Sequence, residues 1–223
     1  MRSKGRAFVI AIDGPAGSGK STVSKLIAKR LGLLYIDTGA MYRALTLKAM
    51  RSGLDLNDES SLTKLAGSAN IDLKEAEGSL SVFLDGEDVS GSIRTPELTN
   101  NVKYIARVPG VRKEMVGLQR AIGERSSAIL EGRDIGTVVF PGADYKFYLD
   151  ASIVERARRR HKELVQSGEA VELEAIKSDV AARDESDMKR PVGALKAADD
   201  AVVIDTTNLS IDEVAEKILS YIK

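Results

Sequence analysis

A glycine-rich segment near the start of the chain constrains its fold more than any other feature. Residues 8–12 read FVIAI, an apolar run that favours a buried strand, and residues 21–31 favour a helix. Gly14 and Gly19 lie between them, separated by four residues and followed by a Lys and a Ser, which is the spacing of a P-loop. Glycines let the backbone curl so that several N–H groups face one phosphate, and the helix N-terminus adds its positive end. The sequence therefore predicts a loop that binds a nucleoside triphosphate.

The residue types in this loop suggest how the triphosphate is held. Lys20 can reach the β- and γ-phosphates, and the hydroxyl of Ser21 can coordinate the Mg²⁺ ion that accompanies ATP. The alternative is a flexible glycine turn before a helix, which would bind nothing. The loop residues expected to bind ATP are Gly14, Pro15, Ala16, Gly17, Ser18, Gly19, Lys20, Ser21 and Thr22.

Composition limits the other partners. The chain of 223 residues carries 33 basic and 33 acidic side chains, so its net charge gives no reason to expect nucleic acid or a membrane surface. It has no cysteine, which excludes disulfides and thiolate metal sites and is compatible with a reducing cytoplasm. Residues Met1–Arg6 are polar, and no apolar stretch approaches membrane-spanning length. We therefore expect a cytoplasmic protein.

Strand-like and helix-like segments alternate along most of the chain. Short apolar strands separated by helices favour an α/β fold of three layers, with a parallel sheet between two layers of helices. The five expected strands are Ala7–Ile12, Leu34–Ile36, Ala128–Leu130, Tyr145–Leu149 and Ala201–Ile204. The expected helices are Ser21–Leu31, Ala40–Ser52, Val111–Glu124, Ile153–Gln166, Glu172–Asp187 and Ile211–Ile222. Residues 71–93 alternate polar and apolar side chains around an Asp-Gly turn at Asp85, which predicts a small antiparallel β insertion.

A second group of signals concerns what receives the phosphate. The chain lacks the Asn-Lys-x-Asp segment of many GTPases and the apolar run ending in Asp-Glu of many ATPase motors. Instead, arginines lie near expected strand ends, where ligands of open α/β sheets bind. Arg43 follows the second strand, where Thr38 can cap a helix, and Arg133 and Asp134 follow the third strand between glycines. Each could instead be a solvated residue or part of a surface ion pair.

Two helical segments add further charge. Arg183, Asp187 and Arg190 are spaced so that one helix face can carry all three. Residues 156–160 contain four arginines, of which Arg156 and Arg160 share a face and could close over a triphosphate. Charge runs of this kind are usually solvent-facing. Together with a P-loop, these arginines indicate two phosphate groups to be neutralised, one on each substrate.

These segments together resemble the bacterial cytidylate kinases, a family of P-loop nucleoside monophosphate kinases. The segments that carry the resemblance are IDGPAGSGKS, DTGAMYR, LDGEDVSGSIRTPE, VPGVR, GRDIGTVVFP, FYLDAS and RDESDMKRP. GRDIGTVVFP and EDVSGSIRT are more particular to this family than the P-loop is. The resemblance covers most of the chain and implies transfer of the γ-phosphate of ATP to CMP or dCMP, with Mg²⁺ as cofactor, in a monomeric protein.

The resemblance also assigns site residues. It implies that the catalytic residues are Lys20, Arg133, Arg190 and Arg158, and that Arg156 and Arg160 approach ATP from a lid. It implies that CMP is bound by Thr38, Tyr42, Arg43, Lys103, Arg112, Arg133, Asp134, Arg183, Asp187 and Arg190. Lys103 stands where relatives have a serine, and Ser186 stands where relatives have an arginine.

Base recognition follows from the chemistry of cytosine. The resemblance sets Thr38, Arg112 and Asp134 around the base. A carboxylate such as Asp134 can accept a hydrogen bond from the N4 amino group, while a guanidinium such as Arg112 donates to the ring acceptors. Uracil would place an acceptor against the carboxylate, so CMP is expected to be preferred to UMP.

The family pattern divides the chain into three parts. These are a core of about residues 1–37, 108–150 and 168–223, an acceptor-binding insertion of about 38–107, and a lid of about 151–167. Two other interpretations remain open. The chain could be a P-loop kinase of another small acceptor, such as UMP, dTMP or shikimate, or a nucleotide-binding regulator without turnover.

Overall fold

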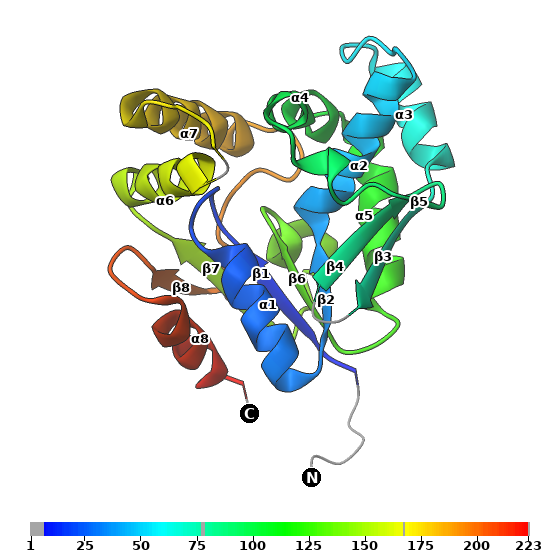
Figure 1. The fold of residues 1–223 in the computed structure, drawn as a ribbon. Helices are drawn as coiled ribbons and strands as arrows, with labels where there is room; N and C mark the ends of the chain where they lie inside the picture. Colours follow the sequence, from blue (N-terminus) through cyan, green and yellow to red (C-terminus); the bar gives the residue numbers. More distant parts are fainter. Residues whose placement is uncertain (1–6, 77–78, 167, 223) are drawn as a thin grey trace.

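The computed structural model describes residues 7–76, 79–166 and 168–222, so the expectation for Met1–Arg6 lies outside the described residues. At its centre is a five-stranded sheet, visible in Figure 1. The strands are β1 (Val9–Asp13), β2 (Leu34–Asp37), β6 (Ala128–Gly132), β7 (Tyr145–Asp150) and β8 (Val202–Asp205). Their order is β2-β6-β1-β7-β8, and every neighbouring pair is parallel. The predicted α/β fold with a five-stranded parallel sheet is confirmed.

Side-chain alternation along the central strand builds a core on each face of the sheet. Ile10 and Ile12 are fully buried on one face, and Ala11 is fully buried on the other. The covering helices are α1 (Lys20–Leu31) and α8 (Ile211–Leu219) on the first face, and α2 (Thr38–Arg51) and α5 (Pro109–Gly123) on the second. α1 and α8 lie side by side in Figure 1. Because both faces are covered, the central strands β1 and β6 are apolar up to their last two residues rather than alternating with polar residues.

The antiparallel insertion is also confirmed. Three strands, β3 (Ile71–Ala76), β4 (Ser79–Leu84) and β5 (Glu87–Asp88), form a second sheet in that order. The turn between β4 and β5 contains Asp85 and Gly86, both with positive φ angles (50° and 89°). Positive φ at both central residues suits the twist of a two-residue hairpin, which explains the Asp-Gly pair.

Two helices of the insertion were not predicted. They are α3 (Glu59–Ser68) and α4 (Pro96–Ala106), and a 3₁₀ turn, η1 (Ser92–Arg94), precedes α4. Both helices begin with a capping residue: Asp58 accepts a hydrogen bond from the Ser61 N–H, and Thr95 accepts one from the Leu98 N–H ahead of the proline at the first helical position. These start signals are present in the sequence, but the helices are short and their apolar faces are recognised only against α5 and α2.

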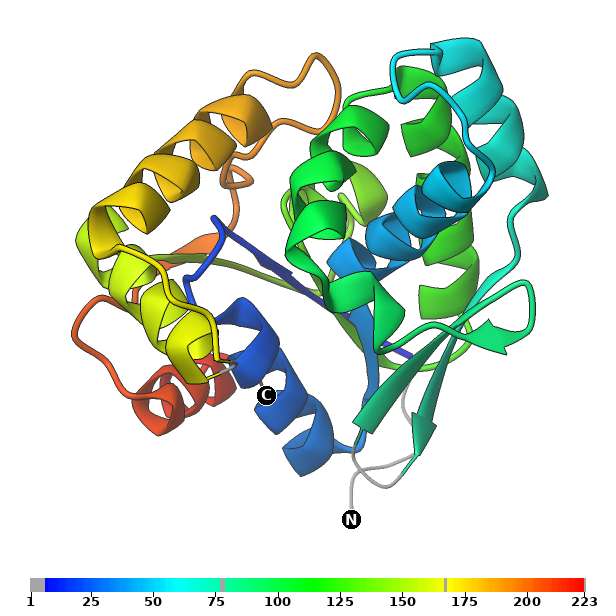
Figure 2. The ribbon, with the colours of Figure 1, turned by 45° about the horizontal axis from the view of Figure 1, so that its top comes forward.

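The remaining helices flank the phosphate loop. α6 (Ile153–Gln166) packs on α7 (Leu173–Met188), and a single π-helical turn, η2 (Ile135–Val139), follows β6. Figure 2 shows α6 and α7 on one side of the P-loop and α2 and α4 on the other. The carboxyl ends of the central strands therefore open between two helical walls, which is where ligands of such sheets bind. Within the described part of the chain, no helix combines the length and apolarity needed to cross a membrane.

Candidate active site

The loop between β1 and α1 has the backbone of a phosphate cradle. Gly14 and Gly19 have φ angles of 145° and 89°, values that side-chain-bearing residues rarely adopt. A Cβ atom on Gly14 would collide with the carbonyl oxygen of Leu149 on the neighbouring strand. Gly19 caps α1 without a side chain, so no side-chain oxygen satisfies the first N–H groups of the helix. The N-terminus of α1 can therefore donate these groups to an anion.

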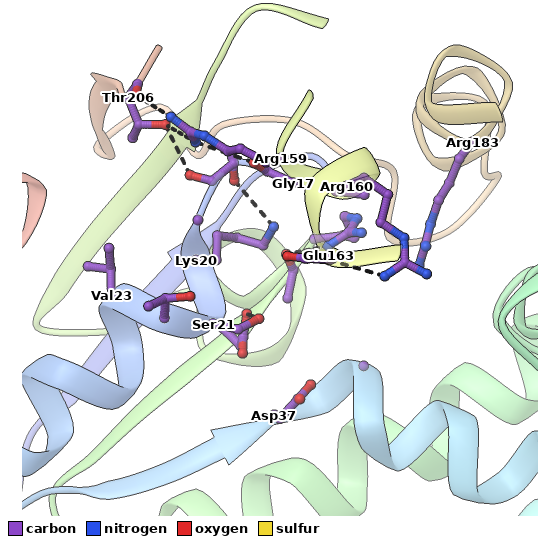
Figure 3. A pocket seen from close by; sticks show the side chains of 18 of the residues that line it. Gly17, Lys20, Ser21, Val23, Asp37, Arg159, Arg160, Glu163, Arg183 and Thr206 are labelled. Atoms are coloured by element: carbon purple, nitrogen blue, oxygen red, sulfur yellow. Dashed lines mark hydrogen bonds and ion pairs between the residues drawn. The ribbon is translucent and has the colours of Figure 1, made fainter. Parts of the chain in front are cut away.

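Lys20 is buried at the start of α1. Its Nζ donates to the carbonyl oxygen of Pro15 at 2.6 Å. Burial lowers the pKa of this ammonium to about 7, and the positive charge of Arg133 adds to the effect, while Glu131 opposes it. A phosphate group beside Lys20 would favour the charged form, so this side chain is prepared for an anionic ligand. Figure 3 shows it extending across the loop.

An oxygen-rich corner lies next to the loop. The hydroxyl of Ser21 donates to Glu131 Oε2 at 2.8 Å, and the hydroxyl of Tyr35 donates to the other oxygen of the same carboxylate. Burial, followed by the nearby charge of Asp37, raises the pKa of Glu131 to about 7. In the part of the chain that the structure describes, no three His, Cys, Asp or Glu residues are close enough to hold a metal ion by themselves.

A cluster of arginines forms the opposite wall. Arg133 Nε donates to Asp187 Oδ2 at 2.7 Å, and Arg190 Nη2 donates to Asp187 Oδ1. Burial opposes ionisation of Asp187, but these two guanidiniums outweigh it and hold its pKa below the usual value. Arg43 and Arg183 also line the cleft, and neither forms an ion pair with any described residue.

Burial and neighbouring positive charges disfavour the charged form of the Arg43 and Arg183 guanidiniums. Burial lowers the pKa of Arg183 to about 10, and the charge of Arg133 contributes. Burial also lowers the pKa of Arg43, and the charges of Arg94 and Arg160 act in the same direction. Figure 3 shows the side chains of Arg160 and Arg183 extending toward each other from α6 and α7. Like charges gathered in a cleft favour an anionic ligand between them.

The far end of the cleft is polar and narrow. Arg112 and Asp134 form an ion pair whose side chains are 2% and 8% exposed. Gly193, with a φ of 68°, passes so close that a Cβ atom there would collide with both partners. The guanidinium of Arg112 lies 5.7 Å from the ring centroid of Tyr42. Arg133 and Asp134 are thus not paired with each other: each has its own partner, from α7 and α5 respectively.

Thr38 has a different contact from the one expected. It does not cap α2, because Asp37 is the cap and accepts a hydrogen bond from the Ala40 N–H at 2.9 Å. Thr38 is the first residue of the helix, and its hydroxyl donates to the carbonyl oxygen of Glu131 at 2.7 Å. The helix therefore starts two residues before the predicted Ala40, and its cap is one residue before the predicted Thr38. Thr38 lines the cleft.

The lid arginines divide into two kinds. Arg156 is buried: its Nη2 pairs with Asp184 at 2.6 Å and its Nη1 donates to the carbonyl oxygen of Ala16 at 3.2 Å. It therefore ties α6 to α7 and to the loop, and it does not line the cleft as expected of an ATP-binding residue. Arg158 and Arg160 do line the cleft, and their side chains are 69% and 41% exposed. Charged side chains this exposed can reorient toward a ligand.

Most predicted site residues meet in one cleft of about 1030 Å³. Those that line it are Ala16, Gly17, Ser18, Gly19, Lys20, Ser21, Thr22, Thr38, Tyr42, Arg43, Arg112, Arg133, Asp134, Arg158, Arg160, Arg183, Asp187 and Arg190. Gly14 and Pro15 are buried and do not line it. Lys103 is exposed, does not line the cleft, and has its Nζ 5.2 Å from the ring centroid of Tyr104. The residues of α4 that face the cleft are Thr99, Val102 and Ala106.

Among the polar residues of the cleft that the sequence analysis did not predict are Glu131, Arg94 and Arg159. Glu131 is the second-to-last residue of β6, so the rule that strand ends carry ligand-binding residues could have found it. Arg94 lies in η1 of the insertion, within the segment EDVSGSIRT, whose resemblance to the family was the signal that could have found it. Arg159 donates from Nη2 to the Thr206 carbonyl oxygen at 2.6 Å and from Nη1 to the Gly17 carbonyl oxygen at 3.3 Å. These contacts join segments far apart in the chain, which a single sequence does not reveal.

Comparisons with known proteins agree with this geometry. A family model described as cytidylate kinase matches residues 10–223. The chain is 51% identical to the cytidylate kinase of Geobacillus sp. (strain WCH70) over 213 residues, or 96% of this chain and 95% of that protein. It is 49% identical to the cytidylate kinase of Clostridioides difficile (strain 630) over 215 residues, or 96% and 98% of the two chains.

Solved structures add a likeness of fold. A gluconokinase from Sinorhizobium meliloti 1021 superposes with a TM-score of 0.50 at 16% identity, covering 97% of this chain and 92% of that chain. An uncharacterized protein from Eubacterium ventriosum ATCC 27560 gives a TM-score of 0.53 at 13% identity, covering 97% and 98%. At these identities the likeness concerns the fold alone.

Proposed function

The chain belongs to the cytidylate kinase family of ATP-dependent nucleoside monophosphate kinases, and on that premise we propose that its cleft transfers the γ-phosphate of ATP to CMP or dCMP, giving ADP and CDP or dCDP. One observation carries the proposal: the two neighbours at the end of β6 face different partners. Arg133 joins a group of arginines around Asp187, and Asp134 joins Arg112 in the narrow end of the cleft. The first arrangement suits a phosphate, and the second suits the polar edge of a base.

The donor phosphates bind the P-loop. The curled backbone of residues 14–19 and the free N–H groups of α1 surround the β-phosphate, and Lys20 reaches the γ-phosphate. The buried position of Lys20 supports this role, because an ammonium with a lowered pKa gains most from an anionic neighbour. Thr22 follows in the same helical turn and lines the same cleft.

The cofactor is Mg²⁺ carried by ATP. The hydroxyl of Ser21 and the carboxylate of Glu131 meet at 2.8 Å beside the loop, and both are the hard oxygen ligands that Mg²⁺ prefers. Mg²⁺ is usually held by one or two protein groups together with substrate phosphates and water, so this small donor set fits the ion. When bound, Mg²⁺ supplies charge neutralisation across the β- and γ-phosphates.

The acceptor phosphate binds Arg43, Arg133 and Arg190. A nucleoside monophosphate has a second pKa of about 6, so its attacking oxygen is already largely ionised at neutral pH. The protein therefore needs no strong general base, and its contribution is alignment and charge neutralisation. Arg183 and Asp187 lie beside this group and face the sugar.

The base binds at Arg112 and Asp134. Asp134 accepts the hydrogen bond of the cytosine N4 amino group, and Arg112 donates to a ring acceptor. Thr38 lines the same end of the cleft, and Tyr42 places its ring beside Arg112. Lys103 contributes no base contact in this proposal, since its side chain lies outside the cleft. Thr99 presents a hydroxyl from the same helix, one turn earlier.

Transfer itself is assigned to Lys20, Arg133, Arg190 and Arg158. Arg158 and Arg160 are exposed on α6 and face the cleft, so closure of the lid segment, residues 151–167, would bring them to the transferred phosphate and keep out water. Arg159 and Arg94 are further cations of the cleft, and we assign them to the donor and acceptor sides respectively.

Three further features rest on the family relationship. They are a monomeric protein, a cytoplasmic location, and a division into a core, an acceptor-binding insertion of about residues 38–107 and the lid.

An acceptor panel tests the function. ADP production from Mg·ATP is measured with CMP, dCMP, UMP, AMP and dTMP in parallel, and Lys20→Ala serves as the blank. We expect turnover with CMP and dCMP and little with the others. Turnover mainly on another acceptor would keep a kinase and contradict the roles of Arg112 and Asp134. Binding of ATP without turnover on any acceptor would favour a nucleotide-binding regulator.

A further inference from the structure

A buried carboxylate joins the two halves of the cleft. Asp13 is the last residue of β1, directly before the first glycine of the P-loop, and it is 3% exposed. Its two oxygens accept hydrogen bonds from the backbone N–H groups of Ile135 and Gly136, each at 2.7 Å. Asp13 is not among the predicted site residues, and the proposed function assigns it no role in binding or catalysis.

The hydrogen bonds of the Asp13 side chain connect β1 to η2, a segment that lies outside the sheet. In the parallel ladder Asp13 stands beside Gly132, so backbone pairing already aligns β1 with β6 up to that point. The next residues, Arg133 and Asp134, leave the strand, and the chain then enters the π-helical turn η2. Asp13 holds the first two residues after Asp134. The two residues that meet the acceptor are therefore fixed on both sides, by the ladder before them and by the Asp13 carboxylate after them.

The environment of Asp13 makes this link rigid. The group lies in the apolar interior beside Lys20 and Asp134, and burial is the main influence that raises its pKa, to about 6. A buried carboxylate is tolerated only when its oxygens are satisfied, and here two backbone donors satisfy them. Gly136 lies beside it: a Cβ atom there would be in ordinary contact with Asp13 Oδ2, at 3.4 Å, and closer to Lys146 Cδ, at 3.2 Å.

We propose that Asp13 is a positioning residue that fixes Arg133 and Asp134 relative to the phosphate loop and thereby sets the preference for cytosine over uracil. This inference rests on the proposed function. Base preference depends on the place of the Asp134 carboxylate to within a fraction of an ångström, and in-line transfer depends on the distance between the P-loop and the acceptor phosphate. Asp13 directly precedes the P-loop in the chain, and its side chain binds the backbone that directly follows Asp134.

The central test is Asp13→Asn. An amide can accept only through its oxygen, so one of the two backbone N–H groups would face an NH₂ group and the segment after Asp134 would shift. We expect the ratio of kcat/KM for CMP to that for UMP to fall roughly tenfold or more. The KM for CMP rises and kcat falls, whereas the equilibrium Kd for Mg·ATP changes by less than about threefold, a range typical of a lost peripheral contact.

A matched control exists at the other end of the same strand. Asp144 Oδ2 accepts a hydrogen bond from the Val9 N–H at 2.8 Å, and Asp144 lies outside the cleft. Asp144→Asn makes the same chemical change to an aspartate that holds β1, so it can lower the melting temperature but should leave the CMP:UMP ratio unchanged. A second variant, Gly136→Ala, adds a methyl group to the segment that Asp13 holds, 3.2 Å from Lys146 Cδ, so this segment must shift slightly, and the variant is expected to lower the ratio by a smaller factor.

Different results would contradict the proposed function and the positioning role of Asp13. A wild-type enzyme that does not phosphorylate CMP would overturn the proposed function and this inference with it. If the wild type prefers CMP but Asp13→Asn loses the same factor on CMP and UMP, or loses ATP affinity as strongly as CMP affinity, Asp13 only stabilises the fold. If Asp13→Asn does not fold, Gly136→Ala decides the matter, and an unchanged ratio in that variant overturns the inference.

Discussion

Arg133 and Arg190 donate to opposite oxygens of one carboxylate, that of Asp187. Asp187 is 2% exposed, so the two guanidiniums are held by a buried anion rather than by solvent. Arg133 comes from the end of β6 and Arg190 from the end of α7, segments that are distant in sequence. The carboxylate spaces two positive groups so that both can reach one phosphate, and it lowers the cost of gathering them before the phosphate arrives.

Asp187→Asn should weaken acceptor use strongly. The amide keeps the size of the side chain but no longer anchors both guanidiniums, so Arg133 and Arg190 lose their alignment. We expect kcat/KM for CMP to fall by roughly 10- to 100-fold, the loss typical of a misplacement of about 1 Å. Steady-state kinetics measure it. Asp200→Asn is the control, because Asp200 forms a surface pair with Lys146 outside the cleft. Unaltered kinetics in Asp187→Asn would contradict the anchoring role.

Asp134→Ala should erode the discrimination between bases. The variant leaves Arg112 without its partner, which affects both bases, but only cytosine also loses the acceptor for its N4 amino group, so the additional loss of kcat/KM falls on CMP. Assays with CMP and UMP at saturating Mg·ATP provide the comparison. An equal loss on both substrates would show that Asp134 supports Arg112 without reading the base.

Arg156→Ala should destabilise the protein rather than alter its chemistry directly. The variant leaves the buried Asp184 carboxylate without its partner, and breaking such a pair costs about 3–5 kcal/mol. Urea denaturation measures the change. Arg160→Ala, which removes only an exposed pair with Glu163, should cost less than about 1 kcal/mol but lower kcat. Equal stability losses in the two variants would contradict this division of the lid arginines.

Stability should depend on pH through Asp13. Its pKa is raised from 3.8 to about 6, so between these values the folded state binds more protons than the unfolded state. The stabilisation from the protonated group is complete below pH 3.8 and is lost as the pH rises through about 6. The asparagine side chain of Asp13→Asn does not titrate, so the variant does not lose stability in this way as the pH rises. The unfolding free energy of the wild type relative to the variant should therefore decrease by roughly 2.4 kcal/mol between pH 4 and 7, and a constant difference would contradict it.

Binding of both substrates should protect α6. If Arg158 and Arg160 engage phosphates on closure, the amides of Ile153–Gln166 will exchange with solvent more slowly. Hydrogen exchange is compared for the free enzyme, the enzyme with a non-hydrolysable ATP analogue, and the enzyme with the analogue and CMP. α3, which contributes no residue to the cleft, serves as the internal reference. Exchange of α6 that does not change on addition of both ligands would argue against a closing lid.

The fold and the backbone of the phosphate loop were predictable because their signals are local. Gly14, Gly19 and Lys20 determine a phosphate loop from backbone freedom and spacing alone, and the apolar runs at β1 and β6 determine buried parallel strands. The Asp85–Gly86 turn likewise follows from the φ angles that these residues tolerate. In each case neighbouring residues in the chain supply all of the information.

The partners of the charged side chains, by contrast, depend on the tertiary structure. The sequence put Arg133 beside Asp134, yet each pairs with a residue brought by another helix. The sequence suggested the same ATP-binding role for Arg156 and Arg160, yet Arg156 is buried against Asp184 and Arg160 lines the cleft. It gave no sign that Asp13 would hold the backbone of Ile135 and Gly136. Charged side chains are long and can pair with many groups, so their partners depend on how helices pack across the sheet, whereas glycine and proline act on the backbone where they stand.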